Sequence, residues 1–375
     1  MDIQSSKSRE ECGNISSIVG IVANLVLFAA KFAVGTLFHS VAVIADAVNS
    51  IADAGSSVIS LVSFKLSGKA PDEKHPFGYE RIEYIASSVV AVLIILLGVE
   101  LLQSSFDKIL HPGEIEFSFM IVGVLIFSII TKVGLYSLNI KWAKLFDSSM
   151  LKATAMDSLS DVLATSAVLI SIIVSPLLGF QLDGYMGIVV SGFIIMSGIN
   201  ILRETINSLL GQVPTAELVE AVNSYVSKYE GMLGIHDLVV HNYGPQRNFA
   251  SAHVEVDAKN DILESHDLID NIEQDIVRDL GIELVIHMDP ITTDDPEVNE
   301  LRALTTKVVA TVDSSLSMHD FRVVKGFTHS NLIFDVVVPF QCKKKDKEII
   351  EEINKKIKDH EQSFNTVITI DRSYV

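Results

Sequence analysis

The sequence predicts an α-helical membrane domain of six spans, followed by an α+β region at its C-terminal end. Hydrophobic residues make up 49% of the 375 residues, and the mean hydropathy is +0.39, which is high for a soluble chain. The apolar residues are concentrated in residues 14–210, whereas residues 211–375 have the composition of an ordinary soluble domain. These features exclude a purely soluble enzyme, a disordered protein and a fibrous one.

Cysteine content and charge restrict the possible partners. The two cysteines, Cys12 and Cys342, are far apart, so the sequence offers neither a disulfide framework nor a thiolate zinc site. The formal net charge is −18, which argues against nucleic acid as a partner. The charge is concentrated in residues 211–300, which contain 19 acidic and 4 basic side chains. A segment this acidic concentrates cations around it.

Six apolar stretches are long enough to cross a bilayer, because its hydrocarbon core requires about 20 residues of helix. The charged start of the chain has no signal-peptide cleavage motif, so we expect the first stretch to remain in the mature protein. Residues 1–13 are predicted to be an N-terminal tail, and residues 14–210 the membrane domain. The expected spans lie near residues 14–38, 40–64, 82–106, 117–139, 153–180 and 184–206.

Lysine and arginine in the short connections indicate the orientation of the spans. They precede the first span and lie between spans 2 and 3 and between spans 4 and 5. The connections on the opposite side contain only Lys108. Because cytoplasmic connections carry the excess of positive charge, we expect both termini in the cytoplasm. We also expect the protein in the cell membrane.

Residues 211–292 are predicted to form an α+β domain in the order helix, strand, strand, helix, strand, from alternating and helical patterns of apolar residues. A weaker copy follows in residues 293–375, at an offset of 82 or 83 residues. In it, MHDFRVVKG resembles IHDLVVHNY, and TVITIDR resembles LVIHMDP. We interpret this part as a duplicated unit, with chance similarity of strand patterns as the alternative.

Two of the predicted spans carry carboxylates near their middle, where an ionisable group costs about 2.5–3.5 kcal/mol on insertion scales. The polar residues form one pair on each span, Asn49 with Asp53 on span 2 and Asp157 with Asp161 on span 5. The two members of a pair are four positions apart and therefore lie on one face of their helix. If spans 2 and 5 face each other, the side chains converge and require a cation or bound protons. The sequence therefore predicts a metal site at Asn49, Asp53, Asp157 and Asp161.

An alternative explanation is that these side chains form hydrogen bonds between helices or lie near an aqueous interface. It would fit Asn49 alone, and also Asp46, which lies one turn away on the same face. It does not explain two matched pairs on two otherwise apolar helices. Asp46 is therefore a weaker ligand candidate than the four paired residues.

Four segments, in order, resemble the cation diffusion facilitator family: HSVAVIADAVNSIAD, PDEKHPFGYERIEYIAS, DSLSDVLATSAVL and GINILRETINSLL. The resemblance covers roughly residues 14–290. It implies six spans, a ferredoxin-like cytoplasmic domain, a homodimer, and proton-coupled export of divalent transition metals through the paired positions on spans 2 and 5. It implies no enzymatic activity and no organic cofactor.

The ligand types at the paired positions bear on which metal is transported. Zinc-transporting relatives place a histidine in this quartet, whereas all four residues here offer oxygen. Imidazole suits zinc, and carboxylate and carbonyl oxygens suit harder ions such as Mn²⁺. The family branches similar to manganese transporters also have Asn or Asp on span 2 and DxxxD on span 5. We therefore expect Mn²⁺ as the transported ion, with Fe²⁺ and Zn²⁺ as alternatives, and protons that compete for the same carboxylates.

The resemblance also implies a cytoplasmic metal site. Two of its residues alternate along a predicted strand and therefore point to one face. The expected ligands are His236, His253, His266, His287 and Asp289.

The second copy keeps only part of this pattern. His319 and Asp371 match His236 and Asp289, but Asp335 and Thr369 replace two histidines. We expect this copy to lack a comparable site and to extend the dimer contact instead.

The connection between spans 2 and 3 often holds a third site in the family. Asp72 and His75 match its pattern, but Tyr79 stands where a further histidine is expected. A hydrogen-bonded loop that caps the third span is the stronger interpretation.

Two functions of other classes remain open. A membrane enzyme with a catalytic metal would need a base or nucleophile beside the aspartates, where the spans offer only serines. The other alternative is a metal-sensing membrane protein that transports nothing. Under this hypothesis, Asp157→Ala leaves cellular metal tolerance intact. The sequence contains no Walker loop, so we do not expect ATP as the energy source.

Overall fold

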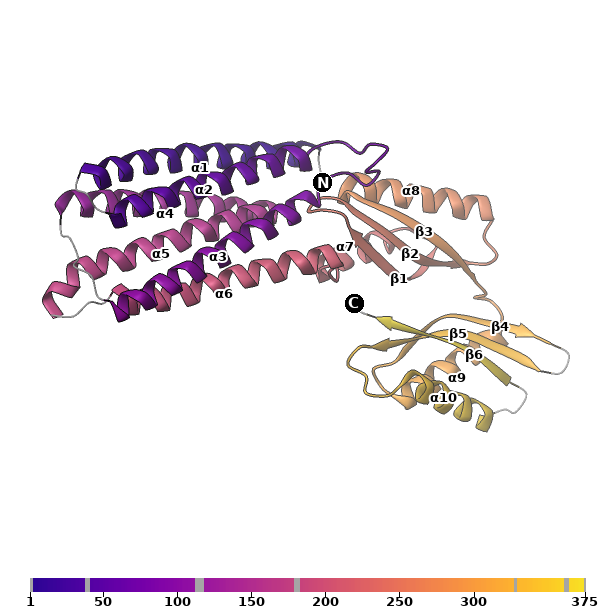
Figure 1. Ribbon diagram of the computed structural model, residues 1–375. Coiled ribbons are helices and arrows are strands. Elements are labelled where there is room, and N and C mark those ends of the chain that lie inside the picture. The colour runs from indigo at the N-terminus through magenta and orange to yellow at the C-terminus, as the bar shows by residue number, and fades with distance from the viewer. Residues whose placement is uncertain are drawn as a thin grey trace. The chain divides into compact units, whose positions relative to one another are not determined.

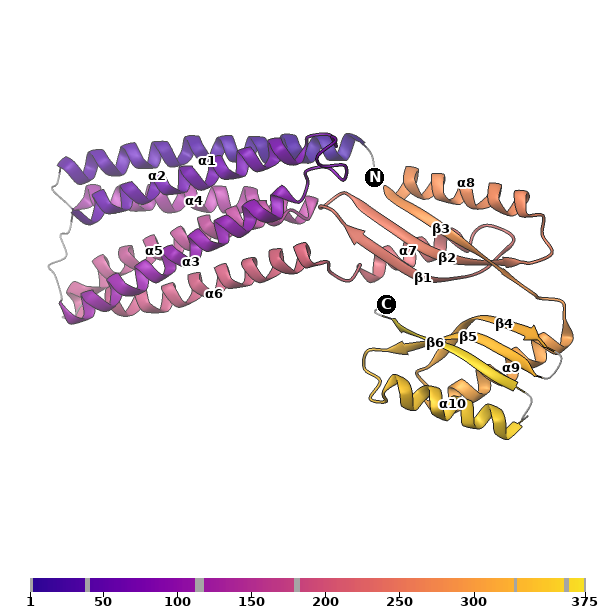
Figure 2. The same ribbon diagram turned by 45° about the vertical axis from the view of Figure 1, so that its right-hand side comes forward.

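The computed structural model describes residues 3–37, 41–111, 118–178, 183–326, 329–360 and 364–373. These residues form two compact bodies, a helical body up to residue 212 that includes residues 242–247, and an αβ body made of the rest (Figures 1 and 2). The predicted span ends at residues 38, 40, 117 and 180 lie outside the described residues.

Six described helices make up the helical body, and each is long and apolar enough to cross a membrane. This confirms the six spans predicted from the sequence. Large hydrophobic side chains such as Ile130 and Val189 are exposed on their surface, as expected for helices that contact lipid. The helices are α1 (Ile3–Leu37), α2 (Val41–Ser67), α3 (Ile82–Leu110), α4 (Phe119–Phe146), α5 (Ser149–Leu178) and α6 (Asp183–Leu210).

The helices pack mainly in pairs, α1 with α2, α3 with α6, and α4 with α5, and α2 also contacts α5. Glycines allow the close approach of α3 and α6. A Cβ on Gly98 would lie 2.7 Å from Cγ1 of Ile195, and one on Gly198 would lie 3.1 Å from the carbonyl oxygen of Ala91. Small residues commonly serve this purpose between membrane helices.

The first helix begins at Ile3, well before residue 14, so the segment predicted to be a tail is mostly helical. Arg9 in this segment is buried and forms an ion pair with the buried Glu83 of α3. Ser148 donates a hydrogen bond of 2.6 Å to the same carboxylate. Charged side chains can be buried when they are paired and hydrogen-bonded in this way. The partner of Arg9 comes from a distant part of the chain, so local sequence patterns do not reveal it.

The first αβ unit has the predicted element order, which confirms the α+β fold. Its strands follow the order β1-β2-β3, with β2 and β3 parallel. Both helices pack on one face of the sheet around Val222, Ile272 and Val254. The opposite face is called the helix-free face below. The elements are α7 (Ala216–Val226), β1 (Met232–Asn242), β2 (Asn248–Asp257), α8 (Ile262–Leu280) and β3 (Ile282–Ile291).

Residues 296–373 form a second αβ unit with the same order of elements. Its sheet has the order β4-β5-β6, with β5 and β6 parallel, and its core lies around Leu332, Phe334 and Ile353. Two separate cores are what a duplicated unit would require. The elements are α9 (Pro296–Val312), β4 (Ser317–Lys325), β5 (Ser330–Pro339), α10 (Asp346–His360) and β6 (Phe364–Ser373).

Candidate metal centres

The helices α2 and α5 bring their polar side chains together inside the helical body. One carboxylate oxygen from each of Asp53, Asp157 and Asp161 lies within 4.8 Å of those of the other two. Asn49 joins them, because its Nδ2 donates a hydrogen bond of 3.5 Å to Oδ1 of Asp161. All four residues singled out from the sequence therefore lie in one group, which we call the intramembrane cluster.

The intramembrane cluster is shielded from solvent. Asp53 is 2% exposed and Asp157 is 5% exposed, while the side chain of Asp161 is 15% exposed. Among the described residues, Oδ1 of Asp53 is buried without a hydrogen-bond partner. Buried carboxylates are costly unless a positive charge or a proton compensates them. The cluster therefore needs a compensating positive charge or bound protons.

The chain itself places one positive charge at the cluster. Lys132 of α4 is 2% exposed, and its Nζ lies 2.7 Å from Oδ2 of Asp53 and 2.5 Å from Oδ2 of Asp161. This ammonium group bridges carboxylates of α2 and α5. Lys132 was not among the residues predicted from the sequence, although a charged residue within an apolar span is the same signal that identified the aspartates.

A second lysine in an apolar span was also missed. Nζ of Lys31 on α1 lies 2.9 Å from Oδ2 of Asp46 and donates a hydrogen bond of 3.1 Å to Ser50. Asp46 thus has a cationic partner of its own. It does not belong to the group of converging carboxylates found among the described residues.

In the first αβ unit, histidines lie on the helix-free face of the sheet. Ala252 and Val254 on β2 are buried in the core, so His253 between them points the other way. His253 is in register with His287 of β3. Its Nδ1 lies 2.8 Å from Oδ2 of Asp289. Ligand atoms of these two histidines and Asp289 lie within 4.8 Å of one another.

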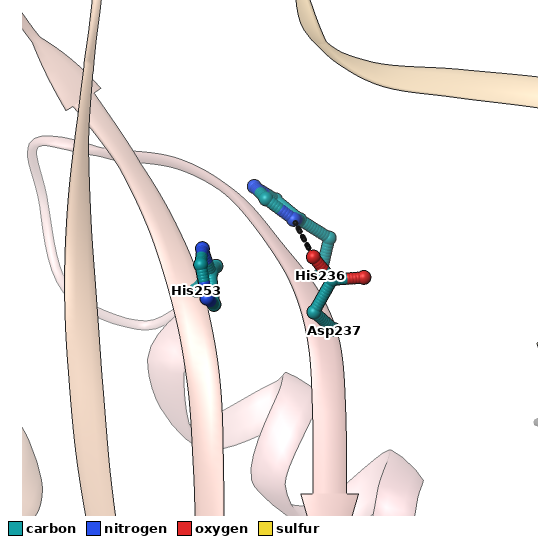
Figure 3. A group of neighbouring side chains, drawn as sticks. All are labelled: His236, Asp237 and His253. Carbon is teal, nitrogen blue, oxygen red and sulfur yellow. Dashed lines mark hydrogen bonds and ion pairs between the residues drawn. The ribbon is translucent and has the colours of Figure 1, made fainter. Parts of the chain in front are cut away.

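The neighbouring strand β1 adds His236 and Asp237 (Figure 3). Ligand atoms of His236, Asp237 and His253 also lie within 4.8 Å of one another. Successive strand residues normally point to opposite faces, but Asp237 has a left-handed backbone with φ 51°. This conformation lets both side chains reach the cluster, and Nδ1 of His236 lies 3.2 Å from Oδ2 of Asp237. We did not predict Asp237; the His-Asp dipeptide that recurs at 319–320 was the available signal.

His266 is placed apart from these residues. It is exposed on α8, which packs against the opposite face of the sheet, and it belongs to none of the groups formed by the described residues. The structure therefore brings together His236, His253, His287 and Asp289 but not His266.

The second αβ unit, for which no comparable site was expected, also gathers ligand-type side chains. His319, Asp335 and Asp371 lie with Asp237 of the first unit in one group. Burial raises the pKa of Asp371, and the nearby carboxylate of Asp237 raises it further. Burial also raises the pKa of Asp237, but His319 and His236 outweigh this and lower it overall.

The loop between α2 and α3 is held by its own hydrogen bonds. Asp72 accepts bonds of 2.7 Å from Lys69 and 2.6 Å from the Tyr79 hydroxyl, and one of 3.0 Å from the backbone N–H of His75. The bonds from Lys69 and Tyr79 hold the pKa of Asp72 well below its usual range. These contacts support the interpretation of a hydrogen-bonded loop, in which Tyr79 acts as a donor to Asp72.

The chain matches two family descriptions in sequence. Residues 17–210 match the cation efflux transmembrane domain, and residues 214–291 match the cytoplasmic domain of cation efflux proteins. The second αβ unit lies beyond both matched segments.

Individual relatives agree with these matches. The chain is 28% identical over 280 residues to the manganese efflux system protein MneS of Bacillus subtilis. The matched residues make up 74% of this chain and 96% of MneS. It is 26% identical over 253 residues to the cation-efflux pump FieF of Salmonella typhi, covering 67% and 84%. It is 28% identical over 251 residues to an uncharacterized transporter of Methanocaldococcus jannaschii, covering 67% and 88%.

The match to the transmembrane domain alone spans more than half of the chain, and the cytoplasmic match follows it directly. The buried carboxylates of α2 and α5 lie within the matched transmembrane domain. The chain therefore belongs to the cation efflux family of membrane transporters, the cation diffusion facilitators.

Proposed function

We propose that the protein exports divalent metal ions, with Mn²⁺ preferred, in exchange for protons. The observation that carries this proposal is the convergence of Asp53, Asp157 and Asp161, buried between helices that can cross a membrane. Family membership supports transport rather than catalysis as the use of this cluster.

The donor atoms support a hard ion. Three carboxylates and the amide of Asn49 offer oxygen, and no histidine belongs to this group among the described residues. Oxygen ligands suit Mn²⁺ better than Zn²⁺, which favours imidazole and thiolate. The relatives named manganese efflux system proteins, MneS and MneP of Bacillus subtilis, are 28% and 24% identical to this chain. Fe²⁺ and Zn²⁺ are the alternative substrates.

Charge balance supports exchange with protons. Three ionised aspartates and Lys132 give the intramembrane cluster a charge of −2, which one divalent ion neutralises. When the ion leaves, two protons restore the same balance. Metal and protons compete for the same oxygens, so coupling requires no separate proton site.

Lys132 can remain near the cluster while the ion binds. It contacts Oδ2 of Asp53, whereas Oδ1 of the same carboxylate has no hydrogen-bond partner among the described residues. An ion bound by Oδ1 would share Asp53 with the ammonium group. We infer that Lys132 positions the carboxylates of α2 and α5 and weakens metal binding enough for release.

We further propose that both termini lie in the cytoplasm and that the ion enters from this side. The ion then leaves on the other side of the cell membrane, after α2 and α5 move. The acidic αβ body would attract cations to the cytoplasmic side. His236, His253, His287 and Asp289 would bind metal in the cytoplasmic domain of a homodimer and tune transport.

Transport into reconstituted vesicles tests the proposal. Under an imposed pH gradient, we expect Mn²⁺ to be taken up faster than Fe²⁺, Co²⁺ and Zn²⁺. Asp157→Asn should reduce uptake to the level of protein-free vesicles, while Asp107→Asn, at an exposed position on α3, should leave it unchanged. Metal binding without any uptake by the parent protein would instead identify a metal sensor.

A further inference from the structure

In the second αβ unit α9 and α10 pack on one face of the sheet. The other, helix-free face of this sheet presents three ligand-type side chains. Phe334 and Val336 on β5 are buried in the core, so Asp335 between them points to the other face. Asp335 is in register with His319 of β4. Asp371 of β6 completes the set, and its Oδ2 lies 3.1 Å from Nε2 of His319. Oδ2 of Asp335 lies 4.0 Å from the same nitrogen.

The first αβ unit adds a fourth side chain and closes the group. Oδ1 of Asp237 lies 3.6 Å from Nε2 of His319. The ring of His236 stacks on that of His319 with 4.1 Å between centroids, and the backbone N–H of Asp320 donates a bond of 3.4 Å to Glu255. These contacts place the helix-free faces of the two sheets against each other at this point.

Several buried polar atoms here lack a hydrogen-bond partner among the described residues. Nε2 of His319 and Oδ2 of Asp371 are two of them, although they are only 3.1 Å apart, because their geometry is not that of a hydrogen bond. Nε2 of His236 also lacks a hydrogen-bond partner in the described part of the chain, but it lies 3.4 Å from Oδ2 of Asp289 and so faces the cluster of the first unit. Buried polar atoms nearly always have partners in folded proteins. An ion between Nε2 of His319 and Oδ2 of Asp371 would supply a partner for both atoms.

The spacing of the donor atoms suits a single ion. One ligand atom from each of Asp237, His319, Asp335 and Asp371 lies within 4.8 Å of the other three. Adjacent ligands of an octahedral ion bound at about 2.1 Å stand roughly 3 Å apart. Small side-chain rotations would therefore bring these atoms to bonding distance of a common centre.

The positions of these ligands repeat those of the first αβ unit. His319, Asp335 and Asp371 follow His236, His253 and Asp289 at offsets of 83, 82 and 82 residues. The three residues of the first unit also lie together on its helix-free face. The second unit thus has ligand-type side chains at the same three places, with one carboxylate in place of an imidazole.

We propose that Asp237, His319, Asp335 and Asp371 bind a divalent first-row transition metal ion and that this ion joins the two αβ units of one chain. Three carboxylates and one imidazole favour Mn²⁺ or Fe²⁺ over Zn²⁺. The site replaces our expectation that the second copy holds none. It does not depend on transport through the intramembrane cluster, and it lies outside the segments matched by the family apart from Asp237.

Metal binding to the purified full-length protein tests the proposal. Every variant carries Asp157→Asn, which disables the intramembrane cluster, and bound Mn²⁺ per chain is measured by equilibrium dialysis with elemental analysis. We expect Asp335→Asn and Asp371→Asn each to lose one ion or to bind it roughly tenfold or more weakly. Asp359→Asn, an exposed carboxylate on α10, is the matched control and should bind as the parent does. Unchanged binding in both test variants, or no ion in this part of the parent, would overturn the proposal.

Two further variants separate this site from its neighbour and test the joining of the units. His287→Ala should affect a different ion and leave this one bound. Asp237→Asn should weaken binding of this ion as Asp335→Asn does. An Mn²⁺ affinity in Asp237→Asn equal to that of the parent would show that the ion does not join the units.

Hydrogen exchange tests the joining of the units directly. In the parent, Mn²⁺ should slow the exchange of residues 234–241 and 317–325 together. In Asp335→Asn this protection should disappear while the core of α10 keeps its exchange rate, which shows that the unit is folded.

Discussion

Nζ of Lys132 lies 2.7 Å from Oδ2 of Asp53, and both side chains are 2% exposed inside the helical body. The two residues come from helices α4 and α2, and the same ammonium group also contacts Asp161 of α5. A fixed positive charge beside the carboxylates changes what the cluster can bind. It lowers the charge that an incoming ion must neutralise, and it competes with that ion for the carboxylate oxygens.

Replacing this lysine is expected to separate binding from transport. In Lys132→Met the carboxylates lose a competing cation, so Mn²⁺ should bind more tightly and transport should slow because release is impaired. Without metal, the variant should unfold at a lower temperature, since breaking a buried ion pair costs about 3–5 kcal/mol. Added Mn²⁺ should raise its unfolding temperature more than that of the parent. Dialysis, vesicle uptake and thermal unfolding measure these effects.

The matched control is Lys141→Met, which removes an exposed lysine from the same helix. It should leave Mn²⁺ affinity and uptake unchanged. Weaker Mn²⁺ binding in Lys132→Met, with uptake as fast as in the parent, would contradict the role that we assign to this residue.

The amide of Asn49 is expected to contribute to metal selectivity. Asn49→His places an imidazole beside Asp161, which Asn49 contacts in the parent. Because imidazole suits zinc, the ratio of Zn²⁺ to Mn²⁺ uptake should rise in this variant, by roughly tenfold. Competition uptake in vesicles measures the ratio, and Asn49→Gln, which keeps the amide, is the control. A ratio equal to that of the parent would show that the donor set does not select the ion.

The ion pair between Arg9 and Glu83 is expected to stabilise the helical body. Glu83→Ala leaves Arg9 buried without its partner and should cost about 3–5 kcal/mol of stability. Glu100→Ala, at an exposed position on the same helix, should have little effect. Thermal unfolding in detergent measures both. The double variant Arg9→Met and Glu83→Leu should be more stable than Glu83→Ala; equal or lower stability would argue against a role for the unpaired charge.

The loop residues are expected to contribute no metal site. His75→Ala should leave the number of bound ions unchanged, because Asp72 is engaged by Lys69 and Tyr79 rather than free for an ion. Tyr79→Phe removes one of these bonds and should speed hydrogen exchange within residues 69–81. Elemental analysis and hydrogen exchange measure the two effects. Loss of one bound ion in His75→Ala would show that the loop between α2 and α3 does bind a metal ion.

Much of the architecture was predictable from the sequence because its signals are local. Hydropathy over about 20 residues located the six spans, and strand and helix periodicities located the first αβ unit. The spacing of four within Asn49 and Asp53, and within Asp157 and Asp161, placed each pair on one helix face. Charged residues are rare in apolar spans, which singled out the aspartates.

Only the tertiary structure showed which side chains meet. Lys132 contacts Asp53 across 79 positions of sequence, and Asp237 meets Asp371 in a different αβ unit. No periodicity encodes these contacts, since they depend on how α4 lies against α2 and how one sheet faces another. The left-handed backbone at Asp237 is likewise invisible in the strand pattern, yet it turns two successive side chains toward one cluster. Sequence determined which residues could carry charge into the interior; packing decided which charges face one another, because Coulomb and coordination energies depend on distances set by the whole fold.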